Sequence, residues 1–229
     1  LAAISGSSVK YAIGPDVVRF VDDFVRSPLT ASDGPLGWTV TLVEAGAGES
    51  TITKPDAIGG HLLLTTDAAE DDGITMQLAG EAFEFTTDQY ATYFGIRFQC
   101  SEATQIDWLV GLCITDTTPL GGMTDGVYFE KLDGGTGISF TVEKDSVETQ
   151  ADSLATFAAA TWITVEFYFT AGVTPNTLKA YIDGVLKSTP ALTNLPNDEF
   201  LTPTIQVLAG SAAARTMTID WIRVIQVGR

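Results

Sequence analysis

The chain has 229 residues, 45% of them hydrophobic, and its 29 acidic and 12 basic residues give a formal net charge of −17. A chain of this length can bury a sizeable core in one domain. The negative charge argues against nucleic acid and anionic membranes as partners, because no basic face would release counterions. Its longest apolar runs, such as 108–114, are far shorter than the roughly 20 residues of a membrane helix.

From the N-terminus, an irregular segment precedes a regular series of β-patterned segments. Residues 1–15 contain small residues without a clear period and predict an N-terminal arm, either ordered on a partner or frayed. A single domain is expected at 16–229. Apolar and polar residues alternate in its strands, which Gly, Asp, Asn and Pro clusters separate. Strands are expected at 18–25, 37–43, 61–66, 73–78, 91–99, 107–115, 126–132, 137–143, 146–150, 161–169, 178–189, 203–209 and 215–226.

The strand series indicates an all-β fold. About a dozen alternating strands with almost no helical period favour two packed antiparallel sheets. The Ala-rich stretch 152–160 predicts either one or two helical turns or a loop over the sandwich edge. No repeat of fixed period is visible, which excludes propellers and solenoids. The expected architecture is a jelly-roll β-sandwich.

The last third of the chain resembles the end of the concanavalin A-like lectin/glucanase superfamily. The resemblance rests on Trp162, on Tyr181 with the Asp183-Gly184 turn, and on the closing run 220–224, Asp-Trp-Ile-Arg-Val. The pieces 22–24, 37–40 and 125–132 are also similar, though less specific. Independently, an Asp-Gly dipeptide between alternating segments predicts a type I′ hairpin. The resemblance implies a concanavalin A-like jelly roll, not a reaction.

The superfamily includes hydrolases of the laminarinase/lichenase type, in which a Glu-x-Asp-x-x-Glu strand supplies nucleophile and acid/base. Glu143, Asp145 and Glu148 match this spacing and are the candidate catalytic residues. However, 144–146 reads as a turn, which would not fix three carboxylates in one cleft. The equivalent strand by position, near 107–115 or 125–132, offers no carboxylate pair. We therefore expect no enzyme, with a polysaccharide hydrolase as the enzymatic alternative.

Few other residues indicate site chemistry. His61 is the sole histidine and is expected at a surface or strand edge rather than as the base of a catalytic triad. The acidic loop with Glu70, Asp71 and Asp72 is the candidate Ca²⁺ site, with a solvated loop as the alternative. Cys100 and Cys113 lack metal or redox spacing and are expected as buried free thiols.

The tryptophans divide into core candidates and one ligand-binding candidate. Trp108, Trp162 and Trp221 lie in strands that also bury aliphatic residues, which favours core packing. Trp38 follows a Gly-Pro-Leu-Gly turn and is the candidate exposed aromatic for ligand binding.

An acidic, lysine-poor, Thr-, Ala- and Gly-rich sandwich with an arm is typical of proteins that decorate surfaces. The leading hypothesis is a non-enzymatic virion surface protein, such as a bacteriophage capsid decoration or cement protein. It is expected to form a homo-oligomer, with a trimer favoured. Its expected partner is a capsid or other virion protein. Its expected location is the virion surface or the extracellular space. The alternative is a lectin-like carbohydrate-binding module with a glycan as ligand.

Overall fold

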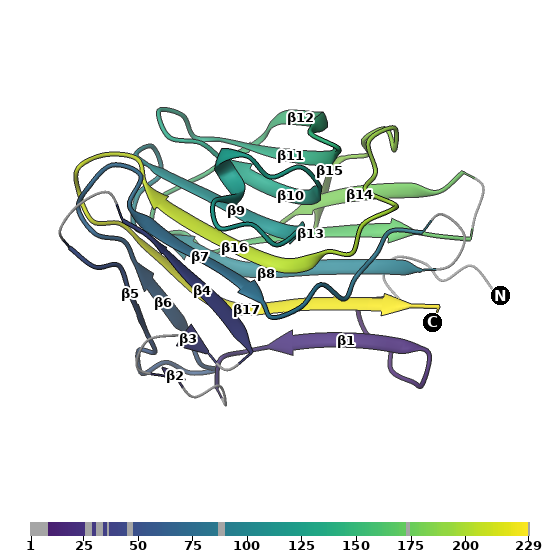
Figure 1. The fold of residues 1–229 in the computed structure, drawn as a ribbon, viewed down its shortest axis with the longest axis horizontal. Coiled ribbons are helices and arrows are strands. Elements are labelled where there is room, and N and C mark those ends of the chain that lie inside the picture. The colour runs from purple at the N-terminus through teal and green to yellow at the C-terminus, as the bar shows by residue number, and fades with distance from the viewer. Residues whose placement is uncertain are drawn as a thin grey trace.

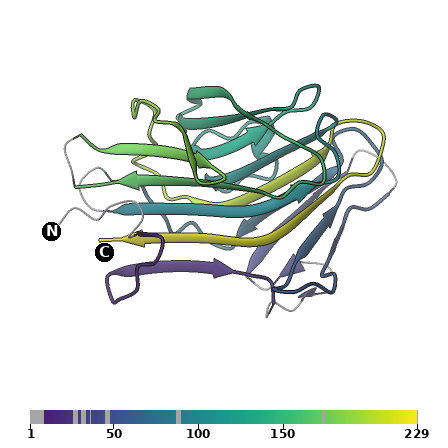
Figure 2. The ribbon, with the colours of Figure 1, turned by 180° about the vertical axis from the view of Figure 1, so that it is seen from behind.

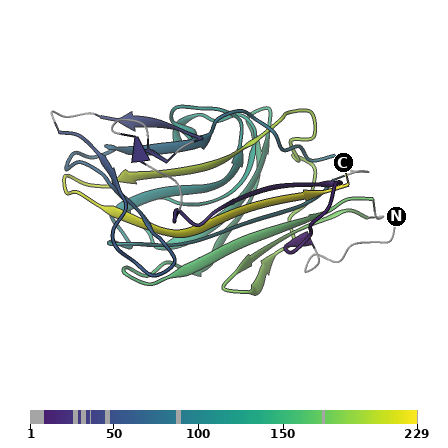
Figure 3. The same cartoon turned by 90° about the horizontal axis from the view of Figure 1, so that it is seen from below.

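Two antiparallel sheets pack face to face in the computed structural model, which describes residues 9–25, 29–30, 34–35, 37–44, 48–86, 90–172 and 175–228. Figure 1 shows the strands, and Figure 3 views the two layers from the side of β1. The eight-stranded sheet follows the order β15 (Val185–Ser188), β14 (Thr177–Ile182), β13 (Ile163–Thr170), β8 (Ala91–Cys100), β17 (Thr216–Val227), β6 (Leu62–Thr65) and β5 (Thr51–Thr53), with β1 (Val17–Asp22) also paired to β17.

The seven-stranded sheet forms the second layer. Its order is β12 (Val147–Thr156), β11 (Gly137–Lys144), β10 (Gly126–Lys131), β9 (Ile106–Cys113), β16 (Thr202–Ala209), β7 (Gly73–Leu78) and β4 (Trp38–Val43). A short ribbon pairs β2 (Leu29–Thr30) with β3 (Gly34–Pro35), and a 3-10 turn, η1, spans Pro119–Gly121. The predicted all-β jelly-roll sandwich is confirmed. No helix within the described residues has the length and apolar character to cross a membrane.

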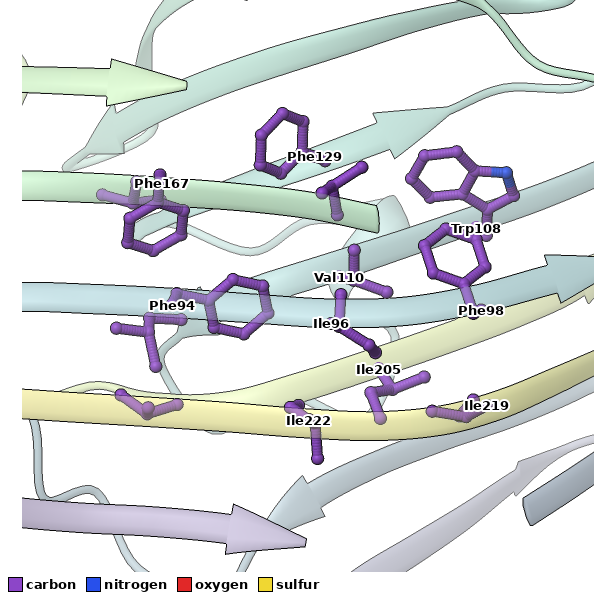
Figure 4. Packing of buried hydrophobic residues seen from close by; sticks show 14 of the residues in the cluster. Phe94, Ile96, Phe98, Trp108, Val110, Phe129, Phe167, Ile205, Ile219 and Ile222 are labelled. Atoms are coloured by element: carbon purple, nitrogen blue, oxygen red, sulfur yellow. The ribbon is translucent and has the colours of Figure 1, made fainter. Parts of the chain in front are cut away.

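The core lies between the sheets because each central strand directs alternate apolar side chains inward. Phe94, Ile96 and Phe98 of β8 face Trp108 and Val110 of β9 within one buried cluster (Figure 4). The rings of Phe98 and Trp108 meet edge to face, with centroids 5.0 Å apart. Burial of such aromatic side chains supplies the dominant stabilisation of a sandwich.

Several local predictions have clear outcomes. The predicted strand 178–189 is the hairpin β14–β15, in which Asp183 (φ 50°) and Gly184 (φ 75°) both have the positive φ of a type I′ turn. Residues 152–156 continue β12, so neither helical turns nor a loop begin there. Cys100 and Cys113 are buried free thiols, as expected, and they end strands of different sheets.

The described part of the N-terminal segment packs on the protein's own sandwich. Val9 is buried on the outer face of the eight-stranded sheet, in a cluster with Ala91, Tyr93 and Ile225. Residues 1–8 of the predicted arm lie outside the described residues. The segment from Val9 onwards therefore contributes side chains to this outer face.

Candidate functional site

The candidate catalytic carboxylates lie on a hairpin rather than on one strand. Asp145 (φ 51°) and Ser146 (φ 62°) form the predicted turn between β11 and β12. Glu143 and Glu148 are cross-strand partners on either side of it. The Glu-x-Asp-x-x-Glu spacing is therefore divided by a chain reversal, and Asp145 sits at its tip.

Glu143 is a buried carboxylic acid on the outer face of the seven-stranded sheet. Its side chain is held by Tyr128, whose hydroxyl donates to Oε2 at 3.0 Å. Burial, with a smaller contribution from the opposing Glu148, raises the pKa of Glu143 to about 7, although the hydrogen bond from Tyr128 lowers it. Glu130, on β10, accepts hydrogen bonds from Thr141 and Gln150, and burial raises its pKa as well. Both glutamates are engaged by neighbouring strands.

The central strand of this sheet carries no carboxylate pair. The outward residues of β9 are Asp107, Leu109, Gly111 and Cys113, because their alternate neighbours face the core. Asp107 Oδ1 accepts the backbone N–H of Asp133 at 2.7 Å. Of the two strands near which the resemblance places the catalytic strand, β9 thus has one outward carboxylate, which holds a loop, and β10 has Glu130.

The connection 114–125 covers much of the outer face of the same sheet. Gln77 on β7 donates to the carbonyl of Ile114 at 2.9 Å and accepts the N–H of Asp116 at 2.9 Å. Gln206 on β16 accepts the N–H of Leu120 at 2.8 Å. Beneath the loop, a small second core joins Leu109, Cys113, Met123 and Tyr128. This part of the face is filled by the protein itself.

Three other carboxylates form a group that suits a hard cation. Ligand oxygens of Glu44, Asp67 and Asp72 lie within 4.8 Å of one another. Asp72 belongs to the predicted acidic loop, whereas Glu70 and Asp71 are not members of the group. Carboxylate oxygens are the ligands that Ca²⁺ prefers, so these residues are where such an ion would be held.

Three of the four tryptophans differ from the sequence prediction. Trp38, expected to be exposed, is 5% exposed, and its Nε1 donates to Asp22 Oδ2 at 3.3 Å. Trp108 is in the core, as expected. Trp162 and Trp221, expected in the core, are half-buried and lie outside the core cluster.

A β-bulge explains the position of Trp221. The register between β17 and β8 shifts between Ile219 and Trp221, so Asp220 is an extra residue. Without the bulge, Trp221 would have the same parity as the buried Ile219. With it, Trp221 is paired with Arg97, and Ile222 enters the core instead. Because of the bulge, Trp221 lies on the outer face together with Asp220.

The outer face of the eight-stranded sheet carries aligned rows of aromatic and cationic side chains across β14, β13, β8, β17 and β1, which lie side by side in Figure 2. One row runs Lys179, Tyr168, Tyr93, Ile225, Arg19, the next runs Tyr181, Glu166, Gly95, Arg223, Val21, and the third runs Thr164, Arg97, Trp221. We call Tyr93, Trp162, Tyr168, Tyr181 and Trp221 the aromatic face.

Ring contacts connect the three tyrosines of the aromatic face. Tyr168 lies between Tyr181 and Tyr93, with centroid distances of 5.5 Å and 4.9 Å. The absence of a side chain at Gly95 leaves space for these rings. A Cβ at position 95 would clash with the Tyr93 hydroxyl and lie 3.3 Å from the Trp221 ring. Tyr93 itself is fully buried, while the other four rings are half-buried.

Cations stack on the two tryptophans. The Arg223 guanidinium lies 4.7 Å from the Trp221 ring centroid, and the Arg97 guanidinium lies 4.5 Å from that of Trp162. Arg97 also pairs with Asp220, the bulge residue. His61 contacts Trp162 at a centroid distance of 5.1 Å, which places it at the surface, as expected, and half-buried. Cation–π contacts of this kind hold both partners in fixed orientations.

Solved structures with the same architecture include glucanases and lectin domains. An endo-1,3-β-glucanase from Streptomyces sioyaensis superposes with a TM-score of 0.64 at 14% identity, over 95% of this chain and 99% of that one. A β-glucanase from Bacillus licheniformis gives 0.60 at 17% identity, over 90% and 97%. The potassium-bound carbohydrate recognition domain of Emp46p gives 0.58 at 12% identity, over 82% and 88%.

The chain has a concanavalin A-like fold. No protein-family model matches it, and neither does any curated protein sequence. At these identities the likeness to the concanavalin A-like structures concerns the fold alone. The aromatic face was missed by sequence reasoning, although the outward alternation of Tyr93, Arg97, Tyr168 and Tyr181 was visible within the predicted strands.

Proposed function

We propose that the protein is a non-catalytic carbohydrate-binding domain whose binding surface is the aromatic face. One observation carries the proposal: Trp162, Tyr168, Tyr181 and Trp221 present half-buried rings on one sheet surface. Tyrosine and tryptophan combine a broad apolar ring with a polar edge, which matches the mixed apolar and hydroxylated surfaces of sugars. The shared fold with glucanases and a carbohydrate recognition domain supports this class of ligand.

The arrangement of carboxylates supports the non-catalytic part of the proposal. Glycoside hydrolysis needs two carboxyl groups on opposite sides of one sugar bond. Here Glu143 and Glu148 face each other across the β11–β12 hairpin at the edge of the sheet, and the central strand β9 contributes only Asp107, which is bound to a loop. An activity on polysaccharides that disappears in both Glu143→Gln and Glu148→Gln would contradict this part.

The binding test is a glycan array followed by calorimetry with the glycan that the array selects. Trp162→Ala and Tyr181→Ala should each weaken binding about tenfold, since a lost ring contact costs on the order of 1 kcal/mol. Phe200→Ala is the matched control, because Phe200 is 54% exposed and lies outside the aromatic face. Equal affinities in all three variants would refute the aromatic face as the binding surface.

The virion-surface hypothesis rests on composition and stays a prediction, as do the trimer, the virion partner and the extracellular location. The structures reported above are glucanases and a carbohydrate recognition domain rather than virion proteins. Glycan binding is compatible with a virion surface protein, so the two hypotheses are separated by oligomeric state rather than by ligand.

A further inference from the structure

A cationic pocket borders the aromatic face. It has a volume of about 250 Å³ and lies where the N-terminal segment crosses β1 and β17. It is lined by Lys10, Tyr11, Arg19, Val21, Arg223 and Ile225. Three of these residues are basic and none is acidic, in a chain whose formal charge is −17. Such a local reversal of charge favours an anionic ligand.

The fold brings the cations together from distant parts of the sequence. Arg19 on β1 is the register partner of Ile225, and Val21 is the partner of Arg223. Burial of Val9 against Tyr93 and Ile225 holds the N-terminal segment in place. Lys10 is thereby fixed above the sheet, with Nζ 5.5 Å from the Tyr93 ring centroid.

Two of the three charges are not neutralised by described residues. Lys10 pairs with Glu166, which also accepts the Tyr93 hydroxyl at 2.8 Å. Arg19 and Arg223 form no ion pair with any carboxylate among the described residues. Arg223 Nε is buried and has no hydrogen-bond partner there. A buried donor without a partner costs free energy that a bound acceptor would recover.

Arg223 joins the pocket to the aromatic face, because the same guanidinium stacks on Trp221 and lines the pocket. A ligand that occupies both must offer a ring-shaped apolar surface and an oxyanion. Arginine forks bind carboxylates and other oxyanions through two parallel hydrogen bonds. A sugar bearing an acidic group has both features.

We propose that this pocket binds the acidic group of a polysaccharide held on the aromatic face, so that the ligand is an acidic glycan. The inference rests on the proposed carbohydrate-binding function and names its ligand class. The shared chemistry is a sugar-borne oxyanion, either the carboxylate of a uronic acid or a sulfate ester. Arg19 and Arg223 are its binding residues.

The test measures binding of the full chain to polygalacturonate, to the same polymer after reduction of its carboxyl groups, to dextran sulfate and to dextran. Binding to either acidic polymer, at least tenfold tighter than to its neutral counterpart, supports the proposal and identifies the anion. Arg223→Gln and Arg19→Gln should each weaken that binding about tenfold or more, as expected for charge-assisted hydrogen bonds. The matched control is Lys187→Gln, an exposed cation of the edge strand β15.

The possible outcomes separate the two proposals. Equal binding to acidic and neutral polymers overturns the acidic ligand but leaves the carbohydrate-binding function standing. No binding to any of these polymers, nor to a glycan array, overturns both. If Lys187→Gln weakens binding as much as the two arginine variants do, the affinity comes from the overall charge of the protein, which overturns the proposal that the pocket binds the acidic group.

Two further measurements guard against misleading results. Arg223→Lys keeps the positive charge but loses the paired N–H donors of the guanidinium. This variant should therefore bind more weakly than the parent chain while retaining its melting temperature. The molar mass in solution is measured in parallel by light scattering. A dimer that Arg223→Gln dissociates would mean that a second copy of this acidic chain occupies the face, which overturns the glycan proposal.

Discussion

The hydroxyl of Tyr128 donates a hydrogen bond of 3.0 Å to the carboxyl group of Glu143, and both side chains are buried on the outer face of the seven-stranded sheet. Burial raises the pKa of Glu143 from 4.5 to about 7. The folded protein therefore holds a proton near neutral pH that the unfolded chain releases.

This pair predicts a loss of stability as pH rises. Between pH 4.5 and about 7 the native state binds more protons at Glu143 than the unfolded state, so the free energy of unfolding falls with increasing pH. The loss is complete above pH 7 and is on the order of 3 kcal/mol. Glu143→Gln keeps an acceptor for Tyr128 and should remove this part of the pH dependence.

Urea denaturation at pH 5 and pH 8 measures the effect. The difference between the two unfolding free energies should be smaller in Glu143→Gln than in the parent chain. Glu199→Gln, at an exposed position, should leave the difference unchanged. An unchanged difference in Glu143→Gln would assign the pH dependence to other carboxyl groups.

Gly95 predicts a steric effect on the aromatic face. A methyl group there would clash with the Tyr93 hydroxyl, which Glu166 holds in place. Gly95→Ala should destabilise the protein by about 1–3 kcal/mol, as overpacking does. Thermal unfolding followed by tryptophan fluorescence measures the stability. Gly135→Ala is the control, since a Cβ at Gly135 meets nothing within 4 Å; equal melting temperatures in the two variants would contradict the prediction.

The N-terminal segment predicts a separate stability effect. Val9 is 1% exposed, so Val9→Ala should lower the free energy of unfolding by about 1 kcal/mol. Removal of residues 1–15 should cost more, because it also breaks the Lys10–Glu166 ion pair. A melting temperature unaffected by the deletion would refute the packing of this segment.

The same shortened chain, starting at Asp16, tests the predicted assembly. Light scattering should give a trimer for the full chain if the virion-type arm hypothesis holds, and a smaller species after deletion. A monomer in both cases would contradict that hypothesis, while the stability effect of Val9 would be retained.

The acidic group predicts a response to calcium. Ca²⁺ held by Glu44, Asp67 and Asp72 would stabilise the folded state, by about 2.7 kcal/mol at a hundredfold excess over the dissociation constant. The melting temperature should rise with Ca²⁺ and fall with a chelator, and Asp67→Asn should abolish the response. Glu70→Gln, outside the group, should retain it. Equal melting temperatures with Ca²⁺ and chelator would remove the calcium prediction.

Strand positions could be predicted from the sequence because alternation and turn residues are local signals. The bounds of β7 and the turn at Asp183-Gly184 follow directly from them. The turn at Asp145 was also predictable, and it lies between Glu143 and Glu148 as expected. These features depend on residues close in the chain, so one sequence is enough to find them.

The candidate site could not be predicted in the same way. The outward position of Trp221 depends on the bulge at Asp220, and a one-residue shift reverses the face of every later side chain. The burial of Trp38 depends on Asp22 and on the ring of Phe20, 5.5 Å away, both from another strand. The cationic pocket needs β1 to pair with the last strand. Each of these is a long-range pairing that local patterns do not specify.

The loop 114–125 limits how much of the seven-stranded sheet is open to a ligand. Its anchors on Gln77 and Gln206 close the sheet over β7 and β16, whereas the surface of β10–β12 near Glu130 and Gln150 retains a cavity of about 440 Å³. A polymer that crossed this sheet from one edge to the other would have to displace the loop.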